Sequence, residues 1–278
     1  MHRPVAVPTD AADLVAPAGL AAEPLERIPA PSVEEFRRGY VVCRHPVVLR
    51  GLSGDWPASR QWSLEYLRDT FGRTPVTTIR AQGGRVIMDA KGGAIEEVVR
   101  LGDFIDSVHA GARDRYMTTS LKGLPECLRR DAPTPVYCAR ANWQNGNLWI
   151  GPAGTIARLH RDLADNIHVL VRGRKRVTLV SPRQSALVYP NGVLERFPNG
   201  CRVDIERPDF VGFPRLREVR SLVTELEPGD AVYIPRGWWH HVRTLETAIS
   251  VNFWWARGVR KGIVLATDLF KRLRGISR

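Results

Sequence analysis

The sequence predicts a mostly β protein with a mixed α/β N-terminal part and a second half that folds as an antiparallel sandwich or barrel. Three observations support this. The 278 residues are 44% hydrophobic and 25% charged, which is typical of a globular protein and excludes collagen, coiled coil and wholesale disorder. Beyond about residue 140, short apolar runs are separated by Gly, Pro and Asn, as strands are by turns. Before that point, helical and strand-like spacings are mixed.

The first elements follow from local signals. Residues 1–30 are rich in Pro and Ala and lack periodicity, so we expect a flexible lead or an arm that drapes over the body. Ser32 with Glu35 forms a capping box, which predicts the start of a short helix. The apolar run at 46–49, followed by Gly51, predicts a buried strand that ends in a turn.

The remaining elements are predicted by periodicity. Helical spacing resumes over 62–67, residues 76–88 alternate weakly around a Gly-Gly pair as a hairpin does, and 95–110 carries regularly spaced apolar residues. The final segment, 257–278, predicts a basic C-terminal helix whose apolar stripe packs on its own domain or on a second copy, as in a homodimer. The strands predicted in the second half are 166–171, 176–180, 231–234 and 248–254.

The net charge is strongly positive, with 41 basic and 29 acidic residues and a balance of +12. Such a charge can attract nucleic acid, an anionic surface or an acidic substrate. Most of it is arginine spread along the chain, and the densest cluster is 257–278. A solvated helix face explains this cluster about as well as a nucleic-acid site does, so an RNA partner stays open.

The sequence also bears on location. No apolar run approaches the roughly 18 residues of a membrane span, and the first residues lack the layout of a secretory signal. The four cysteines are scattered, without a CxxC pair or a disulfide framework. We therefore expect a cytoplasmic protein with reduced thiols and no membrane partner.

The most informative segment contains His160 and Asp162. In a strand, residues two apart point to the same face, so an imidazole nitrogen and a carboxylate oxygen would be presented together. These are two thirds of a 2-His-1-carboxylate metal site, which leaves positions open for other ligands. A lone HxD motif occurs by chance in many proteins, so a second histidine from a distant strand is required.

The segment 228–241 supplies that histidine. A turn at 228–230, an apolar strand and a second turn at 235–237 would aim His240 into the mouth of a barrel. His241 points to the opposite face of a regular strand, so we expect it to pack or to support the site, with an exchange of roles with His240 as the alternative.

Two segments carry a family resemblance. GPAGTIARLHRDLADNIHVLVRGRKRVTLVSP and LEPGDAVYIPRGWWHHVRTLETAISVNFWW resemble the cupin-like JmjC hydroxylases, a group that uses Fe(II) and 2-oxoglutarate and includes the asparaginyl hydroxylase of hypoxia signalling. The likeness extends upstream into FRRGYVVCRHPVVLRGLSGDWPASRQWSLEYL, and so covers roughly residues 34–256. It implies a double-stranded β-helix (jelly roll), here a JmjC/cupin-like domain over 31–256 whose β-helix core begins at about residue 141.

The resemblance also implies roles for single residues. It implies that His160, Asp162 and His240 bind the metal and that further residues contact the cosubstrate, 2-oxoglutarate. Lys175 matches the cation that binds the side-chain carboxylate of 2-oxoglutarate, with a surface lysine as the alternative. The other candidates are the amides of Asn166 and Asn252, which strand-end hydrogen bonds would also explain, and Tyr116, which could equally be a core tyrosine.

Two further positions leave questions. Ala157 stands where relatives often carry a threonine, which removes one hydroxyl donor to the cosubstrate. His168 lies on the same strand face as Asn166 and would line the pocket or serve as a core histidine.

The implied reaction is oxidative decarboxylation of 2-oxoglutarate coupled to hydroxylation of a protein or peptide side chain or of a small molecule. Three alternatives stay open: an RNA nucleoside hydroxylase, an inactive cupin-like binding module, and a non-oxygenase cupin that would not need Lys175.

Overall fold

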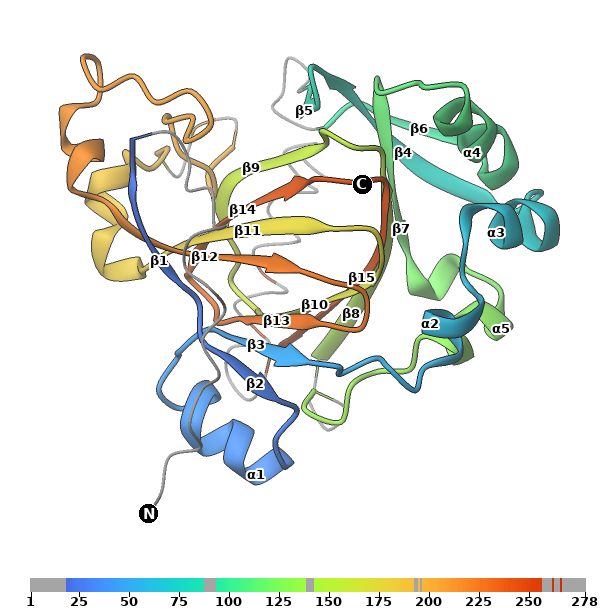
Figure 1. Ribbon diagram of the computed structural model, residues 1–278. Coiled ribbons are helices and arrows are strands. Elements are labelled where there is room, and N and C mark those ends of the chain that lie inside the picture. The colour runs from blue at the N-terminus through green and yellow to red at the C-terminus, as the bar shows by residue number, and fades with distance from the viewer. Residues whose placement is uncertain are drawn as a thin grey trace.

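The computed structural model describes residues 19–87, 94–138, 143–192, 195, 197–256, 262 and 266. In this part of the chain, two curved sheets face each other, and helices flank one of them (Figure 1). Figure 1 shows β9, β14, β11 and β12 one below another, with β13 and β3 next below and β10 and β8 behind them, as in a jelly roll.

The front sheet runs in the order β1, β12, β11, β14, β9 and β5. Its strands are β1 (Ala21–Pro24), β12 (Arg220–Leu226), β11 (Lys175–Val180), β14 (Trp239–Thr244), β9 (Ile156–Arg161) and β5 (Arg85–Val86). The back sheet runs β2, β3, β13, β10, β15, β8, β7 and β4, with β6 paired to β4. Its strands are β2 (Arg27–Pro29), β3 (Val47–Arg50), β13 (Ala231–Ile234), β10 (Asp165–Arg172), β15 (Ala248–Ala256), β8 (Trp143–Gly151), β7 (Arg115–Ser120), β4 (Pro75–Gln82) and β6 (Glu96–Arg100).

The helices come from the first half of the chain and cover the outer face of the back sheet. They are α1 (Val33–Phe36), α2 (Pro57–Gln61), α3 (Leu64–Phe71), α4 (Leu101–His109) and α5 (Glu126–Asp131). Trp62, Leu67 and Phe104 are buried there in one cluster with Ile167 and Val169 of β10. Since burial of a large apolar side chain contributes about 1.5–3 kcal/mol, this layer is a main source of stability.

The opposite face of the back sheet looks into the space between the sheets. Successive side chains of a strand point to opposite sides, so Asn166, His168 and Leu170 face the interior while Ile167 and Val169 face the helices. Every residue of β10 except the last is buried, because both of its faces are covered. Polar side chains on this interior face can therefore line a site.

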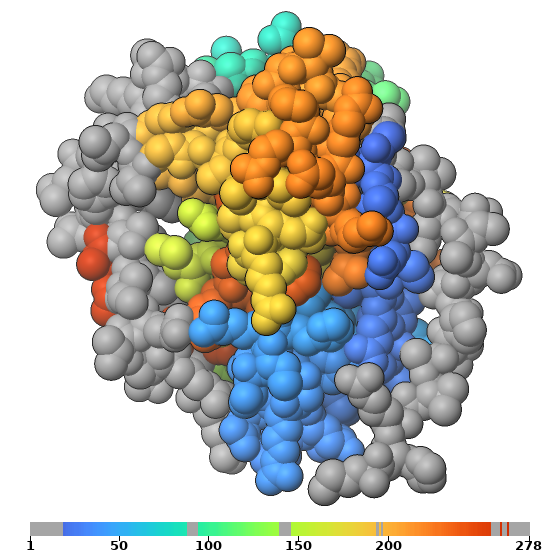
Figure 2. All heavy atoms as spheres, turned by 90° about the vertical axis from the view of Figure 1, so that its left-hand side faces the viewer, coloured from blue at the N-terminus to red at the C-terminus, as the bar shows by residue number. Residues whose placement is uncertain are grey.

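A long insertion between β11 and β12 covers the outer face of the front sheet. It includes the 3-10 helices η4 (Pro182–Val188) and η5 (Pro214–Glu218). Its residues Val188, Cys201 and Ile205 are buried in one cluster with Leu159 of β9 and Trp239 of β14. Figure 2, which looks at the left-hand side of Figure 1, shows the insertion in yellow and orange in its upper part, beside the blue residues of β1. The insertion therefore supports the two strands that carry the histidines of the HxD and WHH segments.

Most predicted elements are confirmed. The capping box begins α1, with the Glu35 amide 3.3 Å from the Ser32 hydroxyl and the Ser32 amide 2.9 Å from the Glu35 carboxylate. The strand at 46–49 is β3, the hairpin at 76–88 is β4 with β5, and the strands predicted in the second half are β10, β11, β13 and β15.

Three predictions differ in detail from the structure or concern residues that it does not describe. The lead predicted for 1–30 is described from residue 19 only, and there the arm over the body is the alternative that holds, since β1 pairs with β12 and β2 pairs with β3. The regular spacing at 95–110 resolves into β6 followed by α4. The predicted helix at 257–278 lies outside the described residues, apart from Gly262 and Ala266.

Among the described residues, none of the helices combines the length and the apolar character needed to cross a membrane.

Candidate metal and cosubstrate site

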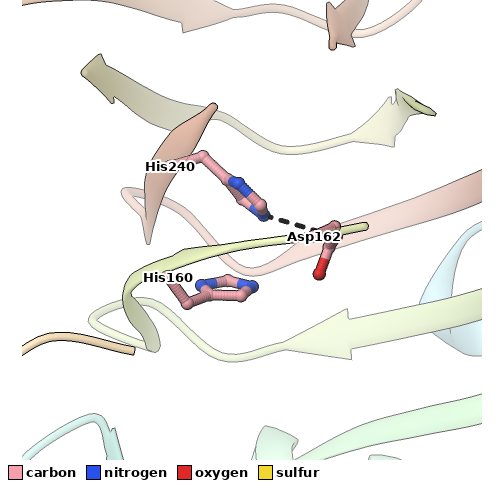
Figure 3. Close-up of side chains that lie close together, drawn as sticks. All are labelled: His160, Asp162 and His240. Carbon is pink, nitrogen blue, oxygen red and sulfur yellow. Dashed lines mark ion pairs between the residues drawn. The ribbon is translucent and has the colours of Figure 1, made fainter. Parts of the chain in front are cut away.

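Three potential metal ligands meet at one end of the barrel. His160 lies on β9, Asp162 follows the end of that strand, and His240 lies on β14, directly opposite His160 in the register. Their nearest ligand atoms all lie within 4.8 Å of one another. The two imidazole rings are 4.1 Å apart, and His240 Nε2 is 3.7 Å from Asp162 Oδ2 (Figure 3). The backbone thus delivers two nitrogens and one oxygen to a single point.

Hydrogen bonds hold the three side chains in an orientation suited to a metal. His160 Nδ1 donates to the Arg158 carbonyl at 2.7 Å, and His240 Nδ1 donates to the Trp238 carbonyl at 3.1 Å. Each bond fixes the tautomer that leaves Nε2 with a free lone pair. Burial and the neighbouring His160 lower the pKa of His240 to about 4, so His240 is neutral near pH 7, which is the form that binds metal.

The carboxylate of Asp162 is also held. Trp254 of β15 donates its indole N–H to Asp162 Oδ2 at 2.8 Å. The same oxygen lies 3.7 Å from His240 Nε2, so the indole holds the carboxylate beside that histidine. The donor set of two imidazoles and one carboxylate is that of a facial Fe(II) site, and the residues present fit that ion.

Beyond the triad, the interior contains a buried lysine. Lys175 of β11 is 6% exposed, and its Nζ donates to the Ser250 hydroxyl at 2.6 Å. No carboxylate in the described part of the chain forms an ion pair with it. Burial lowers the pKa of Lys175 to about 7. A buried cation in such surroundings fits a bound anion such as the distal carboxylate of 2-oxoglutarate.

Two amides and a histidine adjoin this lysine in a connected chain. His168 Nδ1 lies 2.6 Å from Asn252 Oδ1, and Asn252 Nδ2 donates to Asn166 Oδ1 at 3.0 Å. Within the described structure, His168 Nε2 and Trp149 Nε1 are buried and have no hydrogen-bond partner. Unpartnered buried polar atoms are costly, and here they line the interior where a polar cosubstrate would lie.

A row of aromatic side chains borders these polar residues. The rings of Tyr116 and Trp149 stack with centroids 5.8 Å apart, and those of Trp149 and Trp254 meet edge to face at 6.4 Å. Burial raises the pKa of Tyr116, so its phenol stays protonated and can act as a donor. The row leads from the predicted cosubstrate tyrosine to the indole that holds Asp162.

The structure therefore brings together the residues predicted for the site. It places His240, and not His241, beside His160 and Asp162, while His241 lies on the outer face with Nε2 3.5 Å from a Glu206 oxygen. Burial lowers the pKa of His241 to about 3, so it is a neutral packed residue near pH 7. Ala157 pairs with Val242 of β14.

Sequence reasoning missed three contributors to the site. They are Trp254, Trp149 and Ser250, to which the sequence analysis assigns no role in the site. The alternation of β15 offered a signal, because Ser250, Asn252 and Trp254 are spaced by two and share one face.

Comparison with known proteins defines the class. A profile described as "cupin-like domain" matches residues 33–261, so the chain belongs to the cupin-like family. Within that family it is of the JmjC type, whose members are Fe(II)- and 2-oxoglutarate-dependent oxygenases, and the metal triad and the buried lysine fit both cofactors.

Similar proteins come from animals and plants. "Lysine-specific demethylase 8" of Danio rerio is 33% identical over 241 residues, covering 83% of this chain and 58% of that protein. "Lysine-specific demethylase JMJ30" of Arabidopsis thaliana is 32% identical over 233 residues, covering 81% of this chain and 53% of that protein. "Jumonji C domain-containing protein 5" of Drosophila melanogaster is 30% identical over 244 residues, with 83% and 59% covered. The chain thus spans between half and three fifths of the length of these relatives.

Proposed function

We propose that this chain hydroxylates a C–H bond in the side chain of a protein or peptide, using Fe(II) held by His160, Asp162 and His240. One observation carries the proposal: the triad lies at the rim of a polar interior that also contains the buried Lys175, which has no ion-pair partner among the described residues. A barrel kept only as a scaffold would have little reason to retain an uncompensated buried charge beside three aligned metal ligands.

Bound Fe(II) and 2-oxoglutarate supply the oxidising chemistry, in which decarboxylation of the cosubstrate is coupled to insertion of oxygen into a C–H bond. The chain binds and orients the reactants. Lys175 pairs with the distal carboxylate of 2-oxoglutarate, while the amides of Asn166 and Asn252 and the phenol of Tyr116 offer hydrogen bonds along its length. The apolar strands on the far side of the interior exclude water.

The names of the relatives favour a protein substrate, since two of them are lysine-specific demethylases. Hydroxylation of an N-methyl group is a reaction of the same type: the N–CH2OH group formed would break at its C–N bond, releasing formaldehyde and leaving an N–H. The net charge of +12 disfavours encounter with strongly basic peptides, so we expect neutral or acidic segments to bind faster.

The test is a peptide library incubated with the Fe(II)-loaded protein, 2-oxoglutarate and ascorbate, with His160→Ala as the control. A peptide that gains the mass of one oxygen atom only with the wild type supports hydroxylation, and loss of a methyl group supports demethylation. Modification of RNA alone, with affinity that falls steeply with salt, would replace the protein substrate by a nucleoside. Metal binding without any turnover of 2-oxoglutarate would leave an inactive module.

A further inference from the structure

We propose that Asp165 and Arg236 form a clamp that positions two of the metal ligands, Asp162 and His240, relative to each other. The inference rests on the proposed metal site and adds to it a pair of residues that touch neither metal nor substrate. They set the distance between the turn that carries Asp162 and the turn that leads into the strand of His240.

The carboxylate of Asp165 is bound to the segment that leads to His240. Asp165 is 5% exposed, and its carboxylate makes three contacts with the strand and the turn that lead to His240. Oδ1 accepts from the Tyr233 hydroxyl at 3.0 Å and from the Arg236 backbone N–H at 3.1 Å. Oδ2 pairs with Arg236 Nη1 at 3.2 Å. The carboxylate thus ties down both the backbone and the side chain of that turn.

The turn after β9 and the turn before β14 lie against each other. Asp162 and Asp165 flank the turn between β9 and β10, whereas Arg236 lies in the turn between β13 and β14. The two turns also meet directly, since the Gly237 amide donates to the Asp162 carbonyl at 2.8 Å. Each turn is joined to one ligand, so a change in their docking would change the distance between Asp162 and His240.

The turn that carries Arg236 transmits this docking to the histidine. Gly237 has a φ of +81°, a conformation that glycine adopts without strain, and the Trp238 amide closes the turn onto Pro235 at 3.1 Å. The carbonyl of Trp238 then accepts from His240 Nδ1. A continuous path of covalent and hydrogen bonds thus runs from Asp165 through the turn to the imidazole.

The ion pair between Asp165 and Arg236 is buried. An ion pair this buried gains little net stability, because desolvation offsets the attraction. Arg236 Nε is also buried and has no hydrogen-bond partner in the described structure. Apolar side chains would therefore suit stability at least as well, and a role in fixing geometry explains why charges stand here.

A second buried ion pair provides a matched control. Asp230 pairs with Arg27 at 2.5 Å, and the side chains are 9% and 14% exposed, against 7% and 18% for Asp165 and Arg236. Asp230 also accepts from the Gly51 amide at 3.3 Å, so it too ties a turn to a neighbouring segment. It follows the tight turn after β12 and does not contact the turns that carry the ligands.

The experiment compares D165N and D230N in the full chain, with Co(II) as the metal probe. We expect D165N to weaken Co(II) affinity about 10- to 100-fold and to alter the visible absorption of the Co(II) complex, as loss of a residue that orients ligands does. D230N should lower the melting temperature of the metal-free protein by a similar amount while leaving Co(II) affinity within about twofold. R236Q, which keeps the backbone bond to Asp165, should weaken affinity less than D165N.

Several outcomes would overturn the clamp. Equal effects of D165N and D230N on Co(II) affinity would make Asp165 a general stability residue, and an unchanged affinity and spectrum in D165N would remove its role altogether. If D165N does not fold, R236Q decides the question by the same two readouts. If the wild type itself binds no Co(II), it is the proposed metal site that fails, a result distinct from normal binding in every variant.

Discussion

The interior between the two sheets has an apolar part and a polar part, and the same strands contribute to both. On β10, Leu170 belongs to an apolar cluster with Val48 and Val232, yet His168, two residues earlier on the same face, hydrogen-bonds to Asn252. The apolar part lies where β3, β12 and β13 meet. The polar part is lined by side chains of β9, β10, β11, β14 and β15, and it contains the metal triad and the buried lysine.

The difference shows how one barrel separates stability from chemistry. Residues in the apolar part are buried without polar atoms to satisfy, so they stabilise the fold directly. The polar part has a buried cation and two unpartnered polar atoms, which cost stability until a ligand is bound. Substitutions in the apolar part should therefore lower stability and leave metal affinity unchanged. Substitutions in the polar part should weaken ligand binding and change stability little.

Asp162→Ala should abolish tight metal binding with little loss of stability. The substitution removes the only carboxylate of the triad, so we expect affinity for Mn(II) or Fe(II) to fall by at least about 100-fold. Asp162 is partly exposed, so the melting temperature of the metal-free protein should change little. Equilibrium dialysis with metal analysis measures the first quantity and calorimetry the second. A variant that still binds tightly would place the metal elsewhere.

Leu226→Ala should lower stability and leave metal binding intact. Leu226 is fully buried in the apolar cluster, so the truncation should lower the free energy of unfolding by about 2–5 kcal/mol. Metal affinity of the folded variant should stay within about twofold, because the triad lies in the other part. Denaturant unfolding and metal titration on the same sample check both. A loss of metal affinity as large as that of Asp162→Ala would refute the separation of the two parts.

Lys175→Met should weaken 2-oxoglutarate binding about 100-fold, since it removes the buried cation expected to pair with the distal carboxylate. Metal affinity should be preserved, because Lys175 is not a ligand. Titration calorimetry with Mn(II)-loaded protein measures this, and Lys122→Met on the surface serves as the control. Wild-type affinity in Lys175→Met would assign the carboxylate to another residue.

The difference in stability between the wild type and Lys175→Met should depend on pH. Burial lowers the pKa of Lys175 from 10.5 to about 7, so between these values the unfolded chain holds a proton that the folded chain has released. Stability of the unliganded protein should therefore rise with pH from about 7 to 10.5, and the penalty is complete below pH 7. Melting temperatures of the wild type and Lys175→Met across this range should converge as pH rises. A constant difference would contradict the burial of a charged lysine.

Trp254→Phe should have the smallest effect. It removes the indole N–H that donates to Asp162 but keeps an aromatic ring, so metal affinity should fall about 10-fold. The change in melting temperature should be small, because Trp254 is only partly buried. Metal titration against Trp56→Phe, which lies on the helical side, would show whether the loss is specific to the site.

The sequence predicted the parts of the molecule that depend on local pattern. The apolar runs are β10, β11, β13 and β15, and the HxD spacing with a later histidine predicted that His160, Asp162 and His240 lie together, as they do. The strand containing His160 ends at Arg161, so Asp162 reaches the site from a turn and not from the strand face. Local pattern alone does not distinguish these two cases.

Contacts between distant segments could not be predicted in this way. Asp165 and Arg236 are 71 residues apart, and nothing in either neighbourhood indicates the other. The same holds for the indole of Trp254 and the carboxylate of Asp162, which are 92 residues apart. At 95–110, the exposed and half-buried alternation of β6 runs directly into the amphipathic α4, so a single spacing pattern concealed a boundary.

The most direct test of the central claim is succinate release from the purified protein given Fe(II), ascorbate and 2-oxoglutarate, with His160→Ala and Lys175→Met measured in parallel. We predict slow turnover in the wild type, none in His160→Ala, and in Lys175→Met a rate that recovers only at much higher 2-oxoglutarate. Equal succinate formation in all three proteins, or failure of the wild type to bind either Fe(II) or 2-oxoglutarate, would contradict the assignment of the polar interior as an oxygenase site.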